Sequence, residues 1–309
     1  MNIPENLESV LSRDERATFA LRKLYADCGY SRYKMSKFEE YDLYVRNKDF
    51  LVSDGIITFT DTDGRLMALK PDVTLSIIKN SRVPSGVTKL FYNENVYRVS
   101  AGTNAFREIM QVGLECIGEI GAEEIGEVLK LAKESLATLS NSYVLAVSSL
   151  DLVLALLSHF GIGETDAALI IKNLSEKNAE AIRAVALSLG LSDSDADKLA
   201  LLADIYGDTA SALGSLEELK LSGECEAAID ALALATSSLG ERAVIDFSVT
   251  GNASYYNGLA FVGYIEGVPT GILKGGQYDK LAERVSGRKT RAIGFAVYLD
   301  ELEKLGAEV

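Results

Sequence analysis

Residues 92–118 include a predicted strand whose largely polar face could form the floor of a binding site. This stretch predicts two strands joined by a turn-rich loop. Because successive side chains of a strand point to opposite faces, the second strand has one apolar face and one largely polar face. The apolar face comprises Met110, Val112, Leu114 and Cys116, and the other comprises Arg107, Ile109, Gln111, Gly113 and Glu115. Two interpretations stay open. Solvent wets the polar face, as is common, or Arg98, Gln111 and Glu115 are the polar groups of a pocket.

A second group of polar residues lies near the start of a predicted helix. Residues 70–80, KPDVTLSIIKN, are typical of a helix with Pro71 in its first turn. Asp72 and Thr74 then lie where side chains cap backbone amides. The same positions could bind a charged group of a ligand, and the sequence leaves both roles open.

The composition argues against several kinds of site. The 309 residues carry a net charge of −14, which disfavours a surface for non-specific nucleic-acid binding. The three cysteines are far apart and are expected to be small core residues in a reducing compartment. The single histidine, His159, is expected to end a helix near Gly161. These spacings predict no metal site, no Ser-His-Asp triad and no cofactor.

The chain has no sign of a targeting or membrane segment. No N-terminal stretch combines a basic start with an apolar run, as a secretory signal would. No apolar stretch approaches the ~18 residues that a membrane span needs. We therefore expect a soluble, cytoplasmic protein that does not contact a membrane.

The elements that must position these residues form an α+β pattern, with helices packed on an antiparallel sheet. Helices are predicted at residues 13–28, 70–80, 122–139, 151–160, 182–189, 195–202, 225–234, 277–285 and 298–305. Strands are predicted at 56–61, 66–69, 89–98, 107–117, 143–147, 243–249, 255–265, 270–273 and 292–296. Residues 161–240 are rich in alanine, leucine and acids, and predict a small all-helical insertion. The core domain then comprises residues 1–160 and 241–309.

Five segments, in order along the chain, resemble the catalytic core of class II histidyl-tRNA synthetases. They are FEEYDLYVRN (38–47), KPDVT (70–74), YRVSAGTNAFREIMQVGLECIG (97–118), SYYNGLAFVGYI (254–265) and GGQYDKLAERVSGRKTRAIGFAVYLDEL (275–302). They are similar to that family's segment after the dimer-forming helix, substrate-amine segment, motif 2, histidine-specific strand and motif 3. The resemblance implies the class II synthetase fold, an antiparallel sheet flanked by helices, with a helical insertion.

Several positions depart from the synthetase pattern at the residues of adenylation. Gly251 stands where the family has an arginine that touches the substrate carboxylate and the reacting phosphate. Glu301 stands where another arginine grips ATP, and a carboxylate there reverses the electrostatics. Tyr298 replaces a glycine and would crowd an adenosine. Motif 2 matches the family pattern only in part, although its Arg98 is kept. After motif 3 we expect no anticodon-binding domain.

A synthetase scaffold altered in this way resembles the regulatory subunits of ATP phosphoribosyltransferase. That resemblance implies a subunit with no catalytic activity of its own. Its implied roles in histidine biosynthesis are to enable the short catalytic subunit and to carry feedback inhibition by histidine. It also implies a homodimer within a hetero-octamer, and no tRNA partner.

The resemblance further implies a histidine site. The positions that match those binding the α-amino group are Asp72, Thr74 and Gln111. Glu115 and Tyr256 match positions that read the imidazole, and Tyr255 lies on the same predicted strand. A pocket kept only for packing is the alternative.

The carboxylate of such a ligand lacks its usual arginine because of Gly251. Arg98, Arg107, backbone amides near Gly251 or a side chain of the catalytic subunit are candidate replacements. Gly258 and Ala260 are expected to share the strand face of Tyr256 and to leave room beside it.

Two rival functions fit many of the same residues. One is a truncated synthetase-like enzyme that activates histidine with ATP, against which Gly251 and Glu301 argue. The other is an amino-acid sensor that acts alone or with a different partner.

Overall fold

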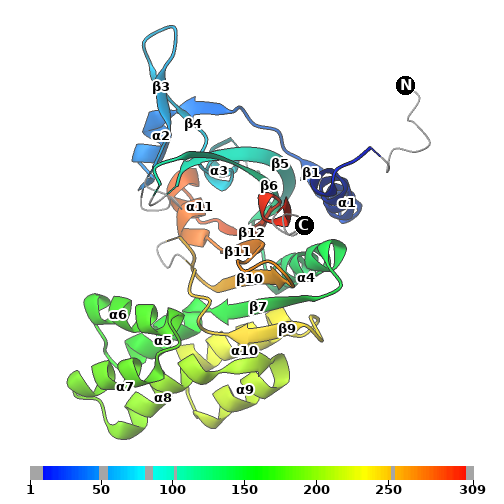
Figure 1. Ribbon diagram of the computed structural model, residues 1–309. Helices are drawn as coiled ribbons and strands as arrows, with labels where there is room; N and C mark the ends of the chain where they lie inside the picture. Colours follow the sequence, from blue (N-terminus) through cyan, green and yellow to red (C-terminus); the bar gives the residue numbers. More distant parts are fainter. Residues whose placement is uncertain (1–9, 49–54, 81–85, 101–102, 252–254, 304–309) are drawn as a thin grey trace.

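A nine-stranded sheet and a three-stranded sheet organise the described chain (Figure 1). The structure is a computed structural model, and it describes residues 10–48, 55–80, 86–100, 103–251 and 255–303. The strand order is β1-β5-β6-β12-β11-β10-β7-β9-β8 in the large sheet and β2-β4-β3 in the small one. The strands are β1 (Ser31–Arg32), β2 (Phe38–Glu40), β3 (Thr58–Thr60), β4 (Leu66–Leu69), β5 (Val87–Val99), β6 (Phe106–Gly118), β7 (Tyr143–Ser149), β8 (Tyr206–Asp208), β9 (Ala243–Asp246), β10 (Leu259–Ile265), β11 (Leu273–Gln277) and β12 (Arg291–Tyr298).

Most neighbouring strands pair antiparallel. The longest pair, β5 and β6, runs from Val87 opposite Gly118 to Val99 opposite Phe106. The predicted hairpin at β3 and β4 is also present. The pairs β1–β5 and β7–β9 are parallel. The predicted α+β class, with helices on a mainly antiparallel sheet, is confirmed.

One face of the large sheet is covered by α1 (Arg13–Asp27) and α4 (Ala122–Leu139). The side chains of Val112, Leu114 and Cys116 on β6 are fully buried in the cluster that includes these helices. The predicted apolar face of β6 is therefore confirmed. Its other face points toward the opposite layer of the molecule.

The opposite layer contains α3 (Thr74–Asn80), α11 (Asp279–Ser286) and the small sheet with α2 (Tyr41–Val45). Ile77 of α3 and Leu281 of α11 belong to one buried cluster, which also contains residues of β5, β6 and β12. This layer covers the polar face of β6.

The start of α3 differs from the sequence prediction. The helix begins at Thr74, so the expectation that Pro71 lies in its first turn is wrong. The preceding backbone is held in other interactions: Tyr97 N–H donates to the Lys70 carbonyl at 2.9 Å, and Arg98 Nε donates to the Pro71 carbonyl at 2.9 Å. These two bonds fasten the segment before α3 to β5.

The segment from 161 to 240 is mostly helical but not entirely so. It follows α5 (Leu150–His159) and contains α6 (Glu164–Ser175), α7 (Ala179–Ser188), α8 (Asp193–Asp204), α9 (Thr209–Glu218) and α10 (Glu224–Thr236). The prediction of an all-helical segment is wrong at β8, which pairs antiparallel with β9 at the edge of the large sheet. The periodicity of apolar residues did not predict α6 or α9. The division into a core and an insertion stays a prediction.

Two C-terminal strands are displaced from their predicted positions. Gly258 has φ +78°, which interrupts an extended chain, so β10 begins at Leu259. Tyr255 and Tyr256 therefore precede the strand. The prediction that Gly258 and Ala260 share a strand face with Tyr256 is wrong for this reason. β11 begins where the predicted strand 270–273 ends.

Smaller predictions have mixed outcomes. Helix α5 ends at His159, as predicted, and Cys116 and Cys225 are buried, but Cys28 is exposed. The closing helix is the short α12 (Asp300–Glu303), and the predicted part beyond it lies outside the described residues. None of the described helices has the length and apolar character required to span a membrane.

Candidate functional site

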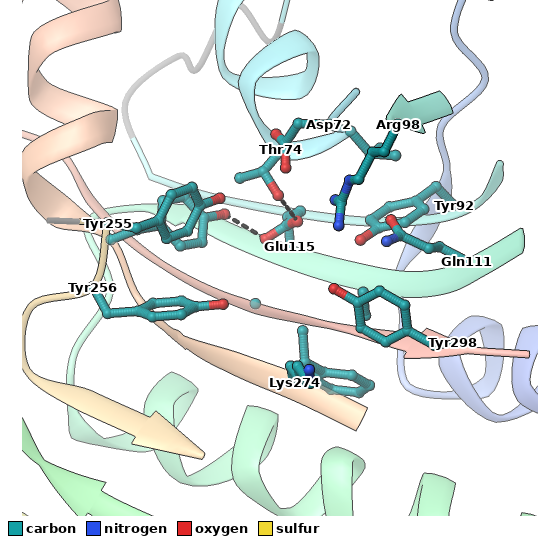
Figure 2. Close-up of a pocket in the computed structure, with 15 residues that line it drawn as sticks. Asp72, Thr74, Tyr92, Arg98, Gln111, Glu115, Tyr255, Tyr256, Lys274 and Tyr298 are labelled. Atoms are coloured by element: carbon teal, nitrogen blue, oxygen red, sulfur yellow. Dashed lines mark hydrogen bonds between the residues drawn. The ribbon is translucent and has the colours of Figure 1, made fainter. Parts of the chain in front are cut away.

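A pocket lies on the face of the sheet covered by α3, over β6, β11 and β12 (Figure 2). About 410 Å³ of space there is not filled by protein atoms, and part of this space is open solvent. All seven residues that the sequence singles out line it: Asp72, Thr74, Arg98, Gln111, Glu115, Tyr255 and Tyr256. The other lining residues are Val73, Tyr92, Lys274, Tyr278, Gly294, Phe295, Ala296 and Tyr298.

The floor of the pocket is the predicted polar face of β6. Gln111 and Glu115 are only 3% and 2% exposed, so this part of the strand is not a solvent-wetted surface. Tyr92 of β5 lies opposite Gly113, between the two polar residues, and its hydroxyl would be 2.5 Å from a Cβ at that glycine. Because residue 113 is a glycine, the Tyr92 ring can occupy the space above it. At the outer end of the same face, Arg107 is exposed.

Glu115 is the most strongly perturbed acid of the site. Thr74 Oγ1 donates to its Oε1 at 2.7 Å, and the Tyr278 hydroxyl donates to its Oε2 at 2.5 Å (Figure 2). Burial, which penalises the charged form, raises the pKa of this carboxyl to about 8, and the nearby Asp72 adds to the rise. The two hydroxyls act against it. The carboxyl can therefore gain or lose a proton near neutral pH.

Asp72 has the capping role that the sequence left open. Its Oδ1 accepts a hydrogen bond from the Leu75 amide at 2.8 Å, within the first turn of α3. Burial raises the pKa of Asp72, while the hydrogen bond from Leu75 and the charge of Arg98 oppose that rise. The same carboxyl lines the pocket, so capping does not exclude contact with a ligand.

Two cations border the pocket from different strands. Arg98 extends from β5 toward the cavity, as Figure 2 shows, with its Nε held by the Pro71 carbonyl. Lys274 of β11 is exposed, and its Nζ lies 5.7 Å from the ring centroid of Tyr298. Because Asp72 and Glu115 supply the acids, the pocket contains groups of both signs.

Tyrosine rings form much of the remaining wall. The rings of Tyr255 and Tyr256 meet edge to face at 4.8 Å between centroids, and Tyr278 lies 5.9 Å from Tyr255. Burial raises the pKa values of all three hydroxyls above their ordinary value of 10. At neutral pH they are therefore protonated and can donate hydrogen bonds.

Sequence reasoning missed Tyr92, Lys274 and Tyr278 as pocket residues. Tyr92 would have required the register of β5 against β6, which no pattern on the polar β5 supplies. Tyr278 directly follows β11, and its hydroxyl reaches Glu115 only because β11 and β12 lie side by side. Neither fact is local in the sequence.

The pocket can bind a small molecule that carries an ammonium, a carboxylate and a further polar group. Buried acids suit the ammonium or another proton donor, and the two cations suit the carboxylate. Within the described ranges, no three or more His, Cys, Asp or Glu side chains are grouped to hold a metal ion.

Comparison with known proteins gives the family. A sequence model described as histidyl-tRNA synthetase matches residues 2–302. The chain belongs to the histidyl-tRNA synthetase family. Its predicted similarity to ATP phosphoribosyltransferase regulatory subunits is also confirmed, because relatives carry that name.

Two such relatives come from Clostridium botulinum and Janthinobacterium. They are 27% and 28% identical, over 97% and 98% of this chain and 75% and 81% of their own length. The crystal structure of an ATP phosphoribosyltransferase regulatory subunit/histidyl-tRNA synthetase from Bacillus halodurans is 26% identical in sequence. It covers 99% of this chain and 81% of its own with a TM-score of 0.84. The predicted class II synthetase-like fold is thereby confirmed.

The positions that depart from the synthetase pattern differ in their places around the pocket. Gly251 is exposed with φ +56°, and a Cβ there would lie 2.8 Å from the ring of Tyr256. Tyr298 lines the pocket beside Arg98. Glu301 does not line it, and its Oε2 accepts a hydrogen bond from the Thr270 hydroxyl at 2.7 Å. The candidate Arg107 forms an ion pair with Asp300 at 3.2 Å and also lies outside the lining.

Proposed function

We propose that this chain is a regulatory subunit of ATP phosphoribosyltransferase that binds histidine in the pocket over β6 and catalyses no reaction itself. In this proposal it is required for the activity of a short catalytic subunit and carries the feedback inhibition by histidine. The names of its relatives support the regulatory role.

One observation carries the proposal: the residues that match the amine and imidazole contacts all line one pocket, while the nucleotide end is altered. Asp72, Thr74, Gln111 and Glu115 are all buried and line the same pocket. At the other end a tyrosine, Tyr298, narrows the space where an adenosine would lie. The arginines expected at 251 and 301 are replaced by a glycine and a glutamate.

The proposed contacts follow from the chemistry of histidine. An ammonium taken out of water needs a carboxylate or several acceptors, which Asp72, Thr74 and Gln111 supply. The imidazole would lie against Glu115 and Tyr256. A carboxyl with a pKa of about 8 becomes ionised more readily once an imidazole N–H, or an imidazolium, faces it.

Feedback inhibition requires more than binding. Histidine must bind the inhibited assembly more tightly than the active one, because a ligand that binds both equally shifts no equilibrium. We infer that the assembly contains a homodimer of this chain within a hetero-octamer, with the short catalytic subunit as partner and no tRNA.

The test combines the purified chain with a short-form ATP phosphoribosyltransferase catalytic subunit. We expect the rate to rise on mixing and the mixture to become sensitive to histidine. Glu115→Gln should preserve the activation and abolish the histidine sensitivity. Glu119→Gln, an exposed position just beyond β6, should change neither property and serves as the matched control. A mixture with unchanged rate and no inhibition would refute the proposal.

The retained Arg98 favours one rival, an enzyme that activates histidine with ATP. That activity would exchange labelled pyrophosphate into ATP when histidine is present. Because of the residues at 251, 298 and 301, we expect no exchange above background. Clear histidine-dependent exchange, lost in Arg98→Gln, would replace the regulatory proposal with the enzymatic one.

A further inference from the structure

The pocket contains a cation that the proposed histidine contacts do not use. Lys274 lines the pocket, and the described part of the chain shows no ion pair or hydrogen bond from its Nζ. Other lysines differ: Lys70 is paired with Glu94, and Lys89 with Glu127. An ammonium beside a polar pocket, with no recorded acid partner, is suited to an anionic group of a ligand.

We propose that Lys274, together with Arg98, binds the carboxylate of the amino acid in this pocket. The inference rests on the proposed function, because it assumes an amino-acid ligand. It identifies the group that replaces the arginine missing at 251. Lys274 thereby becomes a residue that determines specificity for ligands with a free carboxylate.

The pleat of β11 directs Lys274 toward the pocket. Side chains two residues apart in a strand point to the same face. A Cβ at Gly276 would lie 2.6 Å from the ring of Tyr256, so this face of β11 is the pocket face. A Cβ at Gly275 would instead lie 2.5 Å from the ring of Phe261, which belongs to the core on the other side. Lys274 shares its face with Gly276.

The neighbouring residues leave room for the lysine to reach a ligand. Lys274 pairs with Ala296 of β12, and Ala296 pairs with Gly113 of β6. Adjacent strands are about 4.8 Å apart, so the lysine is about 10 Å from Gly113 across a row of small residues. A lysine side chain spans much of that distance, past Ala296 toward the Tyr92 ring, which occupies the space over Gly113.

The cations border different sides of the cavity, as the close-up shows (Figure 2). Arg98 approaches from the side of α3, where its charge also acts on Asp72. Lys274 approaches from the side of Tyr256 and Tyr298. A carboxylate adjacent to an ammonium held at Asp72 could accept hydrogen bonds from both cations. Charge-assisted bonds of this type are among the stronger ones in proteins.

The test measures binding of two ligands by calorimetry. L-Histidine has a carboxylate, and L-histidinol has CH2OH in its place but keeps the amine and the imidazole. We expect Lys274→Met to weaken histidine binding by about tenfold at low salt, which is modest because the lysine is exposed. Histidinol binding should be unchanged in this variant. Lys274→Arg should restore most of the affinity for histidine, and Lys280→Met, an exposed lysine of α11, should affect neither ligand.

Each other outcome contradicts a defined part of the reasoning. Equal histidine affinity in the wild type and Lys274→Met would overturn the role of Lys274 and leave the histidine site standing. Equal losses for histidine and histidinol would mean that the lysine shapes the pocket without contacting the carboxylate, which also overturns the inference. A wild-type chain that binds neither ligand, alone or with the catalytic subunit, would refute the proposed histidine site and this inference with it.

Discussion

Replacing Glu115 by glutamine should remove a large pH dependence from the stability of the ligand-free protein. The carboxyl has an ordinary pKa of 4.5 in the unfolded chain and a pKa of about 8 in the fold. The folded state therefore holds a proton that the unfolded chain releases above pH ~4.5. Stability from this site is fully present below pH ~4.5 and is lost as the pH rises through about 8.

The size of the effect follows from the same two pKa values. Each pKa unit corresponds to about 1.36 kcal/mol, so the site should cost the fold ~3–4 kcal/mol between pH 5 and pH 8. The amide of Glu115→Gln stays neutral throughout. It can accept the hydroxyl of Thr74 at its oxygen and donate to the hydroxyl oxygen of Tyr278, as the protonated acid does. The variant should thus match the wild type near pH 5 and exceed its stability near pH 8.

The measurement is urea unfolding at several pH values for the wild type, Glu115→Gln and the exposed control Glu119→Gln. The informative quantity is the difference in unfolding free energy between variant and wild type, because other titrating groups cancel in it. We expect this difference to grow with pH for position 115 and to stay flat for position 119. A flat difference at position 115 would show that the buried carboxyl has an ordinary pKa, and the electrostatic reasoning would be wrong.

Three further substitutions test the pocket and the layer around it. Asp72→Asn keeps an oxygen that can cap α3 but removes the charge. We expect the stability to stay within ~1 kcal/mol of the wild type and calorimetry to show a clear loss of histidine affinity. An unchanged affinity would mean that Asp72 acts only as a helix cap. Gly294→Ala places a Cβ against the Glu115 carboxyl and 2.5 Å from a backbone carbonyl, so urea unfolding should show a loss of ~1–3 kcal/mol in unfolding free energy. The control Gly214→Ala, in open space on α9, should be neutral or slightly stabilising. Equal effects of the two substitutions would contradict the close packing of the pocket floor. Lys70→Met leaves Glu94 without its buried partner and should lower the unfolding free energy of the protein by ~3–5 kcal/mol. Adding Glu94→Gln should restore part of this loss. A loss below ~1 kcal/mol would mean that water already solvates the ion pair.

The parts of the fold that were predictable are those with a strong local pattern. The period of two along β6 gave both of its faces, and the stripe of apolar residues gave α4 with its bounds. The strand expected at 255–265 begins late because Gly258 adopts a positive φ. A glycine permits this conformation, but its presence in the sequence does not predict it. β8 was missed because three residues, Tyr206–Asp208, carry too little pattern to distinguish a strand from a loop.

The resemblance to the synthetase family predicted part of the site, and the residues that were not predicted reach the pocket through strand register. Asp72, Gln111 and Glu115 occupy recognisable segments, and all of them line the pocket. Tyr92 and Lys274 reach it only through pairings with other strands, β5 with β6 and β11 with β12. Such pairings join residues far apart in the chain, so no window of sequence contains them.

Several features that lower the stability of a protein meet at this one pocket, as we expect of the proposed binding site. Glu115 is a buried acid whose raised pKa lowers the stability of the fold as the pH rises from ~4.5 to about 8. Gly113, Gly276 and Gly294 lie inside strands, where a glycine costs ~0.5–1 kcal/mol, and each is a position where a Cβ would collide with a pocket side chain. A bound cationic group opposite Glu115 would offset the cost of its charge, since a ligand that binds only the folded state stabilises it. Histidine added at saturating concentration should therefore raise the unfolding temperature of the wild type, and it should raise that of Glu115→Gln much less. Equal shifts in the two proteins would place the ligand somewhere other than this pocket.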